Sequence, residues 1–154
     1  MTSFCDRAIL VIEDNPMDVE LVRRALERRH TANPIEVIED GAVALEQIHE
    51  WEAGKPSPIL ILLDLQLPGA SGLEVLRQIK THPQFSGIPV IILTASGEDA
   101  DVKTAYELGA NAYIVKPIDF DRFLQVTDQI ELYWTILDRL PAKSKCAEPS
   151  VASR

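Results

Sequence analysis

Residues 59–69 of this 154-residue chain read Ile59-Leu60-Ile61-Leu62-Leu63-Asp64-Leu65-Gln66-Leu67-Pro68-Gly69. The first five residues form an apolar run without polar alternation, which predicts a strand that is covered on both faces. Such a strand is typical of the centre of a parallel sheet. Asp64 ends the run, and the Pro-Gly pair that follows predicts a loop.

Three other short apolar runs also end on residues that can handle a phosphoryl group. In chain order they are Ile9–Ile12 before Glu13 and Asp14, Ile88–Leu93 before Thr94, and Ala112–Val115 before Lys116. Residues 35–38 add a fifth predicted strand. Because the carboxyl ends of parallel strands meet at one edge of a sheet, we expect these polar residues to form a single acidic pocket with one hydroxyl and one amine.

Segments of helical period alternate with these runs, which predicts repeated βα units and an α/β fold. Helices are expected over residues 16–29, 41–53, a segment that opens after residue 71, 102–108 and 119–140, the last being the longest. Asn15 before Pro16 and Ser71 with Glu74 are N-terminal capping signals, and Gly54 is a C-terminal one. Residues 97–101 are expected to form a polar loop.

The composition is that of a soluble globular domain, with 46% apolar and 25% charged residues. A formal net charge of −9 argues against non-specific binding to nucleic acid, which needs a basic face. The apolar runs are too short to span a bilayer and the first begins too early for a secretory signal, so we expect a cytoplasmic protein. We expect one domain over residues 7–140 and a disordered tail over 141–154.

The predicted acidic pocket favours a divalent cation. Three carboxylates a few ångströms apart repel one another, by about 4 kcal/mol per pair at about 4 Å and an effective dielectric constant of about 20. Either one of them stays protonated or a cation lies between them. Mg²⁺ suits the second case, because it takes carboxylate, water and phosphate oxygens. Glu13 and Asp14 are expected to hold it directly or through water, and the Gln66 carbonyl could complete its coordination.

The remaining polar groups suit phosphoryl transfer. The Asp64 carboxylate can attack phosphorus as a nucleophile and form an acyl phosphate. Lys116 can neutralise a phosphoryl oxygen, or pair with Asp64 when no phosphate is present, and the Thr94 hydroxyl can donate to another oxygen. Each residue alone also fits a structural role, such as a helix cap, a turn or a satisfied strand hydroxyl. Their joint occurrence at successive strand ends favours phosphoryl chemistry.

These motifs carry a family resemblance. Glu13-Asp14, Asp64 within residues 62–69, Thr94-Ala95 and Lys116-Pro117 occur in an order that resembles the receiver domain of bacterial two-component response regulators, over about residues 7–132. The resemblance implies an α/β, flavodoxin-like fold: a doubly wound, five-stranded parallel sheet in the order 2-1-3-4-5, here with an extended last helix. It also implies a cis Lys116-Pro117 peptide.

The same resemblance assigns roles to the site residues. Asp64 would accept a phosphoryl group from a histidine kinase, with Mg²⁺ bound by Glu13, Asp14, Asp64 and the Gln66 carbonyl. Receivers of this family also release the phosphate by attack of water, so the protein would be a phospho-acceptor and not an enzyme with substrate turnover.

A conformational switch is also implied by the resemblance. Thr94 would move toward the phosphoryl group, and Tyr113 would turn inward into the space that Thr94 leaves. Tyr113 as an ordinary core residue is the alternative. Gln66 and Ser96 would flank the path of the attacking water and tune the lifetime of the phosphate.

A narrower resemblance concerns three segments of the second half of the chain. Residues 95–101, 106–113 and 130–141 resemble the single-domain regulators that partner cyanobacterial and bacterial phytochromes. This implies a bacteriophytochrome-type histidine kinase as the partner, and a homodimer through the face made by the fourth helix, the fifth strand and the fifth helix. About 14 residues follow Leu140, so we expect no output domain and no DNA binding, and we expect the protein to act by binding or phosphorelay.

Three other classes of function are alternatives. A pseudo-receiver would keep the fold as an interaction scaffold without phosphorylation, but the acidic pair, Asp64, Thr94 and Lys116 are complete. A phosphatase with an aspartate nucleophile would need a second aspartate at position 66, which is Gln66. A dinucleotide-binding module would need a glycine-rich loop after the first strand, where Asp14-Asn15-Pro16 stands.

Overall fold

The computed structural model describes residues 7–28 and 33–138, with side chains described up to Gln129. One parallel sheet forms the centre of the molecule, in the order β2-β1-β3-β4-β5. Its strands are β1 (Ile9–Ile12), β2 (Ile35–Ile38), β3 (Leu60–Leu63), β4 (Val90–Thr94) and β5 (Ala112–Val115). The predicted fold class and strand order are confirmed.

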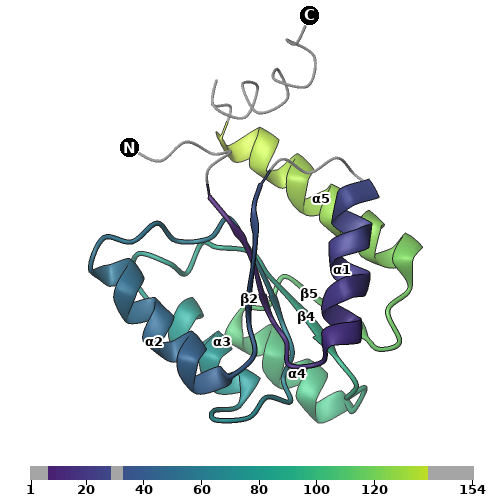
Figure 1. Ribbon diagram of the computed structural model, residues 1–154, viewed down its shortest axis with the longest axis horizontal. Helices are drawn as coiled ribbons and strands as arrows, with labels where there is room; N and C mark the ends of the chain where they lie inside the picture. The colour runs from purple at the N-terminus through teal and green to yellow at the C-terminus, as the bar shows by residue number, and fades with distance from the viewer. Residues whose placement is uncertain (1–6, 29–32, 139–154) are drawn as a thin grey trace, which may run out of the picture.

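Five helices in the described part of the chain cover the two faces of the sheet (Figure 1). They are α1 (Pro16–Arg28), α2 (Gly41–Glu52), α3 (Gly72–Lys80), α4 (Asp99–Leu108) and α5 (Phe120–Asp138). Helices α1 and α5 pack together on one face, whereas α2, α3 and α4 follow one another on the other. The fold is therefore doubly wound, and α5, with 19 residues, is its longest helix.

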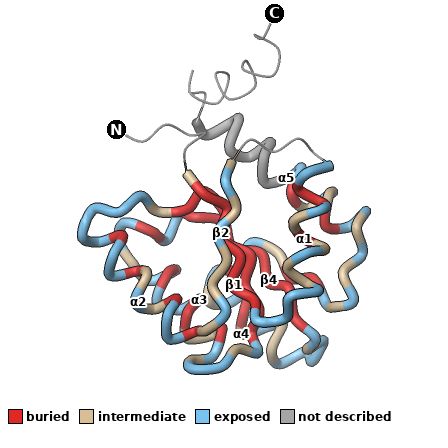
Figure 2. The backbone as a smooth tube through the Cα atoms, in the orientation of Figure 1, coloured by how far each residue is buried: buried red, intermediate tan, exposed pale blue. Residues whose placement is uncertain are grey.

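The side chains of the central strand alternate between two apolar layers. Ile61 and Leu63 pack with the layer under α2, α3 and α4, and Leu60 and Leu62 with the layer under α1 and α5. All four are at most 2% exposed, and Figure 2 shows the sheet as the buried centre of the molecule. The uninterrupted apolar run of β3 is thus explained by burial on both faces.

The capping signals end the helices where the sequence predicts. The Asn15 side chain accepts a hydrogen bond from the backbone N–H of Met17 at 2.9 Å, at the start of α1. Ser71 Oγ accepts from the backbone N–H of Glu74 at 3.2 Å, at the start of α3. Gly54 has φ of +113°, the left-handed conformation that favours glycine after a helix. These caps fix the starts of α1 and α3, which follow β1 and β3, and the end of α2, which precedes β3.

The prediction of a polar loop over residues 97–101 was wrong for its last three residues. Helix α4 begins at Asp99, three residues before the predicted start at Val102. Asp99 and Asp101 lie in its first turn, where carboxylates interact favourably with the positive end of the helix dipole. Their polarity therefore marks a helix start here. Strand β4 also begins later than predicted, at Val90.

The predicted end of the domain at residue 140 and the tail over 141–154 lie outside the described residues. The same holds for the side chains of residues 130–138, on which part of the predicted dimer contact depends. Within the described ranges, no helix is both long and apolar enough to cross a bilayer.

Candidate functional site

The sheet topology brings the predicted polar residues to one edge. Strands β1 and β3 are neighbours although they are not consecutive, and Ile12 is in register with Leu63. The residues that follow, Glu13 and Asp64, therefore leave the sheet side by side. At the next position across the sheet, the register of β4 and β5 pairs Thr94 with Val115, directly before Lys116. The chain reverses its winding direction between β1 and β3, and in open α/β sheets ligands bind at the point of such a reversal.

Three carboxylates converge at this edge. One oxygen from each of Glu13, Asp14 and Asp64 lies within 4.8 Å of the other two. Glu13 and Asp64 are each 4% exposed, whereas Asp14 is exposed. Among the described residues this is the one group of three or more potential ligands with such spacing. Hard oxygen ligands, partly buried and open on one side, fit a divalent cation such as Mg²⁺ or Mn²⁺.

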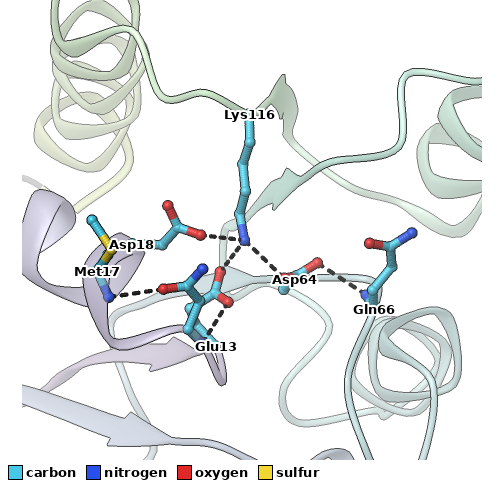
Figure 3. Close-up of polar contacts among 7 residues, drawn as sticks. Glu13, Met17, Asp18, Asp64, Gln66 and Lys116 are labelled. Atoms are coloured by element: carbon cyan, nitrogen blue, oxygen red, sulfur yellow. Dashed lines mark hydrogen bonds and ion pairs between the residues drawn. The ribbon is translucent and has the colours of Figure 1, made fainter.

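Lys116 joins the carboxylates from the opposite side of the site (Figure 3). Its Nζ lies 2.7 Å from Glu13 Oε1, 2.9 Å from Asp64 Oδ2 and 2.8 Å from Asp18 Oδ2. An ammonium group has three protons to donate, and three carboxylate oxygens surround this one. The Lys116-Pro117 peptide that follows is cis, as the resemblance implied.

Asp18 is a member of the site that sequence reasoning missed. It lies in the first turn of α1, four residues after Asp14, and its side chain is 16% exposed. Sequence alone presents it as an ordinary acidic residue at a helix N-terminus. Asp14 precedes α1, so no helical spacing links the two residues, and no local sequence signal indicates Asp18 as a site residue.

Burial and charge act together on the two most enclosed groups. Burial raises the pKa of Glu13 to about 7, and the Asp64 charge adds to this, against the hydrogen bonds from Lys116 and the Asn15 N–H. Burial alone would lower the pKa of Lys116, but its hydrogen bonds to Asp18, Glu13 and Asp64 outweigh burial and raise that pKa. Lys116 is therefore held as a cation.

Backbone N–H groups orient the two buried carboxylates. Asp64 Oδ1 accepts a hydrogen bond from the backbone N–H of Gln66 at 2.9 Å, while Oδ2 faces Lys116. Glu13 Oε2 accepts from the N–H of Asn15 at 3.0 Å, while Oε1 faces Lys116. Each carboxylate thus has one oxygen fixed by its own loop and one directed toward the lysine. Gln66 contacts the site through its backbone N–H, and the predicted role of its carbonyl as a metal ligand stays a prediction.

The loop after β3 is fixed against the start of α2. The N–H of Gly41 donates to the carbonyl of Pro68 at 2.8 Å. A Cβ added to Gly41 would lie 2.0 Å from the backbone oxygen of Ala70, so only glycine permits this approach. The loop that carries Gln66 is thereby held close to the carboxylates.

Thr94 and Tyr113 occupy the interior next to the site. Thr94 is fully buried, and among the described residues its Oγ1 is the buried side-chain polar atom that lacks a hydrogen-bond partner. Tyr113 is 5% exposed and lies inward, with its hydroxyl donating to the Ser96 carbonyl at 2.7 Å. An orphaned buried hydroxyl at a strand end suits a ligand that supplies the missing acceptor.

A doubly wound parallel sheet with an acidic cluster and a lysine at the carboxyl edge of its strands defines the receiver class of signalling domains. The chain belongs to the response regulator receiver domain family, which matches residues 9–128.

Particular relatives are similar over most of the chain. The response regulator Rcp1 of Synechocystis sp. is 37% identical over 139 residues, which cover 88% of this chain and 94% of that protein. A protein of Methanothrix harundinacea described as a probable methanogenesis regulatory protein, FilR2, is 40% identical over 134 residues, with 86% of each chain covered. The chain is therefore related over most of its length to a response regulator and to a protein described as a methanogenesis regulator.

Solved structures give the same fold. The bacteriophytochrome response regulator RtBRR superimposes with a TM-score of 0.72 at 39% identity, covering 96% of this chain and 92% of its own. The phosphorylated cyanobacterial phytochrome response regulator RcpA gives 0.72 at 33% identity, with 88% and 99% covered. Rcp1 in its Mn²⁺-bound form gives 0.70 at 36% identity, with 83% and 94% covered.

Proposed function

We propose that this protein is a response regulator that accepts a phosphoryl group on Asp64 from a histidine kinase. The observation that carries the proposal is the contact of the Lys116 ammonium with the Asp64 carboxylate, beside Glu13 and Asp14. The contact supports the proposal, because it sets an Asp64 oxygen beside a cation at the edge where ligands bind in open α/β sheets.

The proposed reaction is a direct transfer between two proteins. An Asp64 carboxylate oxygen attacks the phosphorus of the kinase phosphohistidine, and the new P–O bond forms as the P–N bond breaks. The imidazole leaves with the electron pair of that bond and is neutral once protonated. Lys116 exchanges a carboxylate partner for a phosphoryl oxygen, and Thr94 Oγ1, which lacks a partner, donates to another.

Glu13, Asp14 and Asp64 are the residues that would hold Mg²⁺, with the Gln66 carbonyl as a further ligand. The convergence of three carboxylates within 4.8 Å supports this assignment. The ion supplies charge neutralisation for the phosphoryl oxygens. The Mn²⁺-bound form of Rcp1 shows that a relative of this chain takes a divalent cation.

Phosphorylation is proposed to bias a two-state element made by Thr94 and Tyr113. The buried, unpartnered Thr94 hydroxyl gains a phosphoryl acceptor, and Tyr113 is stabilised in the inward position that its hydrogen bond to Ser96 already defines. The new contacts shift the population toward the state with this arrangement. The water that hydrolyses the acyl phosphate would approach past Gln66 and Ser96. The protein would then return to its starting state without substrate turnover.

A bacteriophytochrome-type kinase is the proposed phosphoryl donor. The likeness to RtBRR and RcpA supports this choice. Phosphoryl transfer from a radiolabelled phytochrome kinase to this protein is expected to be complete before transfer from an unrelated histidine kinase is detectable. The Asp64→Asn variant is expected to receive no label from either kinase. Equal rates from both kinases would remove the phytochrome assignment while leaving the receiver chemistry in place.

The face of α4, β5 and α5 is the proposed homodimer contact. Tyr106 on α4 and Val115 at the end of β5 are 48% and 43% exposed, which is high for large apolar residues. A symmetric dimer would cover both copies of this patch. We further propose that the receiver domain extends over residues 7–140, which the family match over residues 9–128 supports.

A further inference from the structure

Asp18 contacts the lysine of the site from a helix that carries none of the other site residues. It lies in the first turn of α1, and its Oδ2 is 2.8 Å from Lys116 Nζ (Figure 3). The side chains of the two residues are 16% and 14% exposed. An ion pair this enclosed is screened by salt far less than a surface pair.

The three partners of Lys116 differ in what else they do. Glu13 and Asp64 belong to the acidic cluster whose oxygens lie within 4.8 Å of one another, and Asp18 lies outside it. Glu13 and Asp64 each also accept a hydrogen bond from a loop N–H group. A cation at the cluster therefore competes with Lys116 for Glu13 and Asp64 but not for Asp18, and a phosphoryl group bonded to Asp64 takes up one of that residue's oxygens.

We propose that Asp18 is a positioning residue that keeps the Lys116 ammonium in the site while Glu13 and Asp64 change partners. The inference rests on the proposed phosphoryl transfer to Asp64. Lysine carries its charge on a flexible four-carbon chain, so its head group needs a fixed anion to stay at one point. Asp18 supplies that anion from a helix end that the Asn15 side chain caps.

The contact also joins elements from two sides of the site. Asp18 is on α1, which follows the inner strand β1, whereas Lys116 follows the edge strand β5. The ion pair therefore ties the first turn of α1 to the residue that follows β5.

The test is a double-mutant cycle of Asp18→Asn and Lys116→Ala, read by the rate of phosphorylation from acetyl phosphate with Mg²⁺. Lys116→Ala is expected to accept phosphate slowly, so a rate remains to be measured. Asp18→Asn alone is expected to slow phosphorylation about fivefold, and to change the rate less than about twofold in the Lys116→Ala background. An equal loss in both backgrounds would show that Asp18 does not act through Lys116 and would overturn the inference.

Two further variants separate position from charge. Glu20→Gln removes the same charge from α1, where Glu20 pairs with Arg24 on the surface, and is expected to leave the rate unchanged. Asp18→Glu keeps the carboxylate and is expected to retain more of the rate than Asp18→Asn. A fivefold loss in Glu20→Gln, or an Asp18→Glu variant as slow as Asp18→Asn, would contradict the inference.

A metal-free measurement provides a second readout. The same cycle is followed by urea unfolding without Mg²⁺, and Asp18→Asn is expected to lower the midpoint in the wild-type background but not in Lys116→Ala. Equal shifts in the two backgrounds would contradict the ion pair itself. If wild-type protein takes up no phosphate at all, the proposed function fails; if it does so and Asp18→Asn matches it, only the role of Asp18 fails.

Discussion

Lys116 supplies the positive charge that three carboxylates of the site share. Three carboxylate oxygens lie within 2.9 Å of its Nζ, and the side chain is 14% exposed. Without this cation, Glu13, Asp18 and Asp64 would face one another at short range in a partly buried space. Like charges at such distances are costly unless a proton or a metal ion compensates.

Replacement of this lysine should therefore destabilise the metal-free protein. Lys116→Ala is expected to lower the free energy of unfolding by about 2 kcal/mol without Mg²⁺, because buried carboxylates lose their charged donor. Saturating Mg²⁺ should recover much of the loss, since a ligand that binds only the folded state stabilises it. Chemical denaturation with and without Mg²⁺ measures both effects. Exposed Lys103→Ala is the control, and a Lys116→Ala variant as stable as wild type without Mg²⁺ would contradict this account.

The raised pKa of Glu13 predicts a pH dependence of Mg²⁺ binding. In the folded, metal-free protein the Glu13 pKa is about 7, above its ordinary value of 4.5. The folded state thus binds more protons between these values, and this contribution to stability is lost as the pH rises through 7. Mg²⁺ must displace the proton, so its affinity should rise as the pH approaches 7 and level off above it.

Calorimetric Mg²⁺ titrations between pH 5.5 and 8.5 measure this dependence. Below pH 7 the affinity is expected to change by up to about tenfold per pH unit, the limit for one competing proton. Glu13→Gln should bind more weakly and show a flatter profile. An affinity for wild type that is constant across the range would be inconsistent with a protonated Glu13.

The strand-end residues could be predicted from sequence, whereas Asp18 could not. Glu13, Asp64 and Lys116 each follow an apolar run directly, and parallel strands bring such residues together by construction. Asp18 reaches the same ammonium through the rotation of α1 and the path of the Lys116 side chain. No local sequence pattern indicates the rotation of the helix or the path of the side chain, so only the three-dimensional arrangement reveals the contact.

At the scale of elements, the loop between β3 and α3 depends on a close approach to α2. The backbone oxygen of Ala70 occupies the space where a Cβ of residue 41 would stand. The sequence predicts a loop from Pro68-Gly69, but not its contact with another element, because Gly41 reads only as a weak helix residue. The early start of α4 was missed for a related reason, since acidic residues suit both a solvated loop and a first helical turn.

The glycine contact can be tested with a matched pair of substitutions. Gly41→Ala is expected to cost about 3 kcal/mol of stability, because its Cβ would meet backbone atoms that cannot rotate away. Gly87→Ala, with nothing within 4 Å of the added Cβ, should stay within about 0.5 kcal/mol of wild type. Thermal or urea unfolding compares them. Equal stability of the two variants would show that the loop adapts freely.

At the scale of the whole molecule, the strand order determines where the site lies and where the surface lies that we propose to change on phosphorylation. The site lies between β1 and β3, while Tyr113 lies on β5 at the far edge and is linked to the β4–α4 loop through Ser96. In the proposed switch, a change at Thr94 would be transmitted toward the face that carries Tyr106 and Val115. The alternation of runs predicted a parallel sheet and the family resemblance implied its strand order, but neither indicated the burial state of Tyr113.

Phosphorylation is expected to tighten a dimer through that face. Tyr106→Glu should weaken the phosphorylated dimer at least about tenfold, because it buries a charge in an apolar contact. Val43 on α2 has nearly the same exposure, 47% against 48% for Tyr106, so Val43→Glu is the matched control. Sedimentation at tens of micromolar distinguishes the two. A monomer in both phosphorylation states, or equal effects of the two variants, would show that this face is not the dimer contact.

The central claim concerns one oxygen atom of Asp64. Wild-type protein incubated with acetyl phosphate and Mg²⁺ should gain the mass of one phosphate group, whereas Asp64→Asn under the same conditions should gain none and chelation of Mg²⁺ should prevent the gain. Intact-mass spectrometry reads the result directly. Unmodified wild-type protein, or an Asp64→Asn variant that takes up phosphate as readily, would contradict the account.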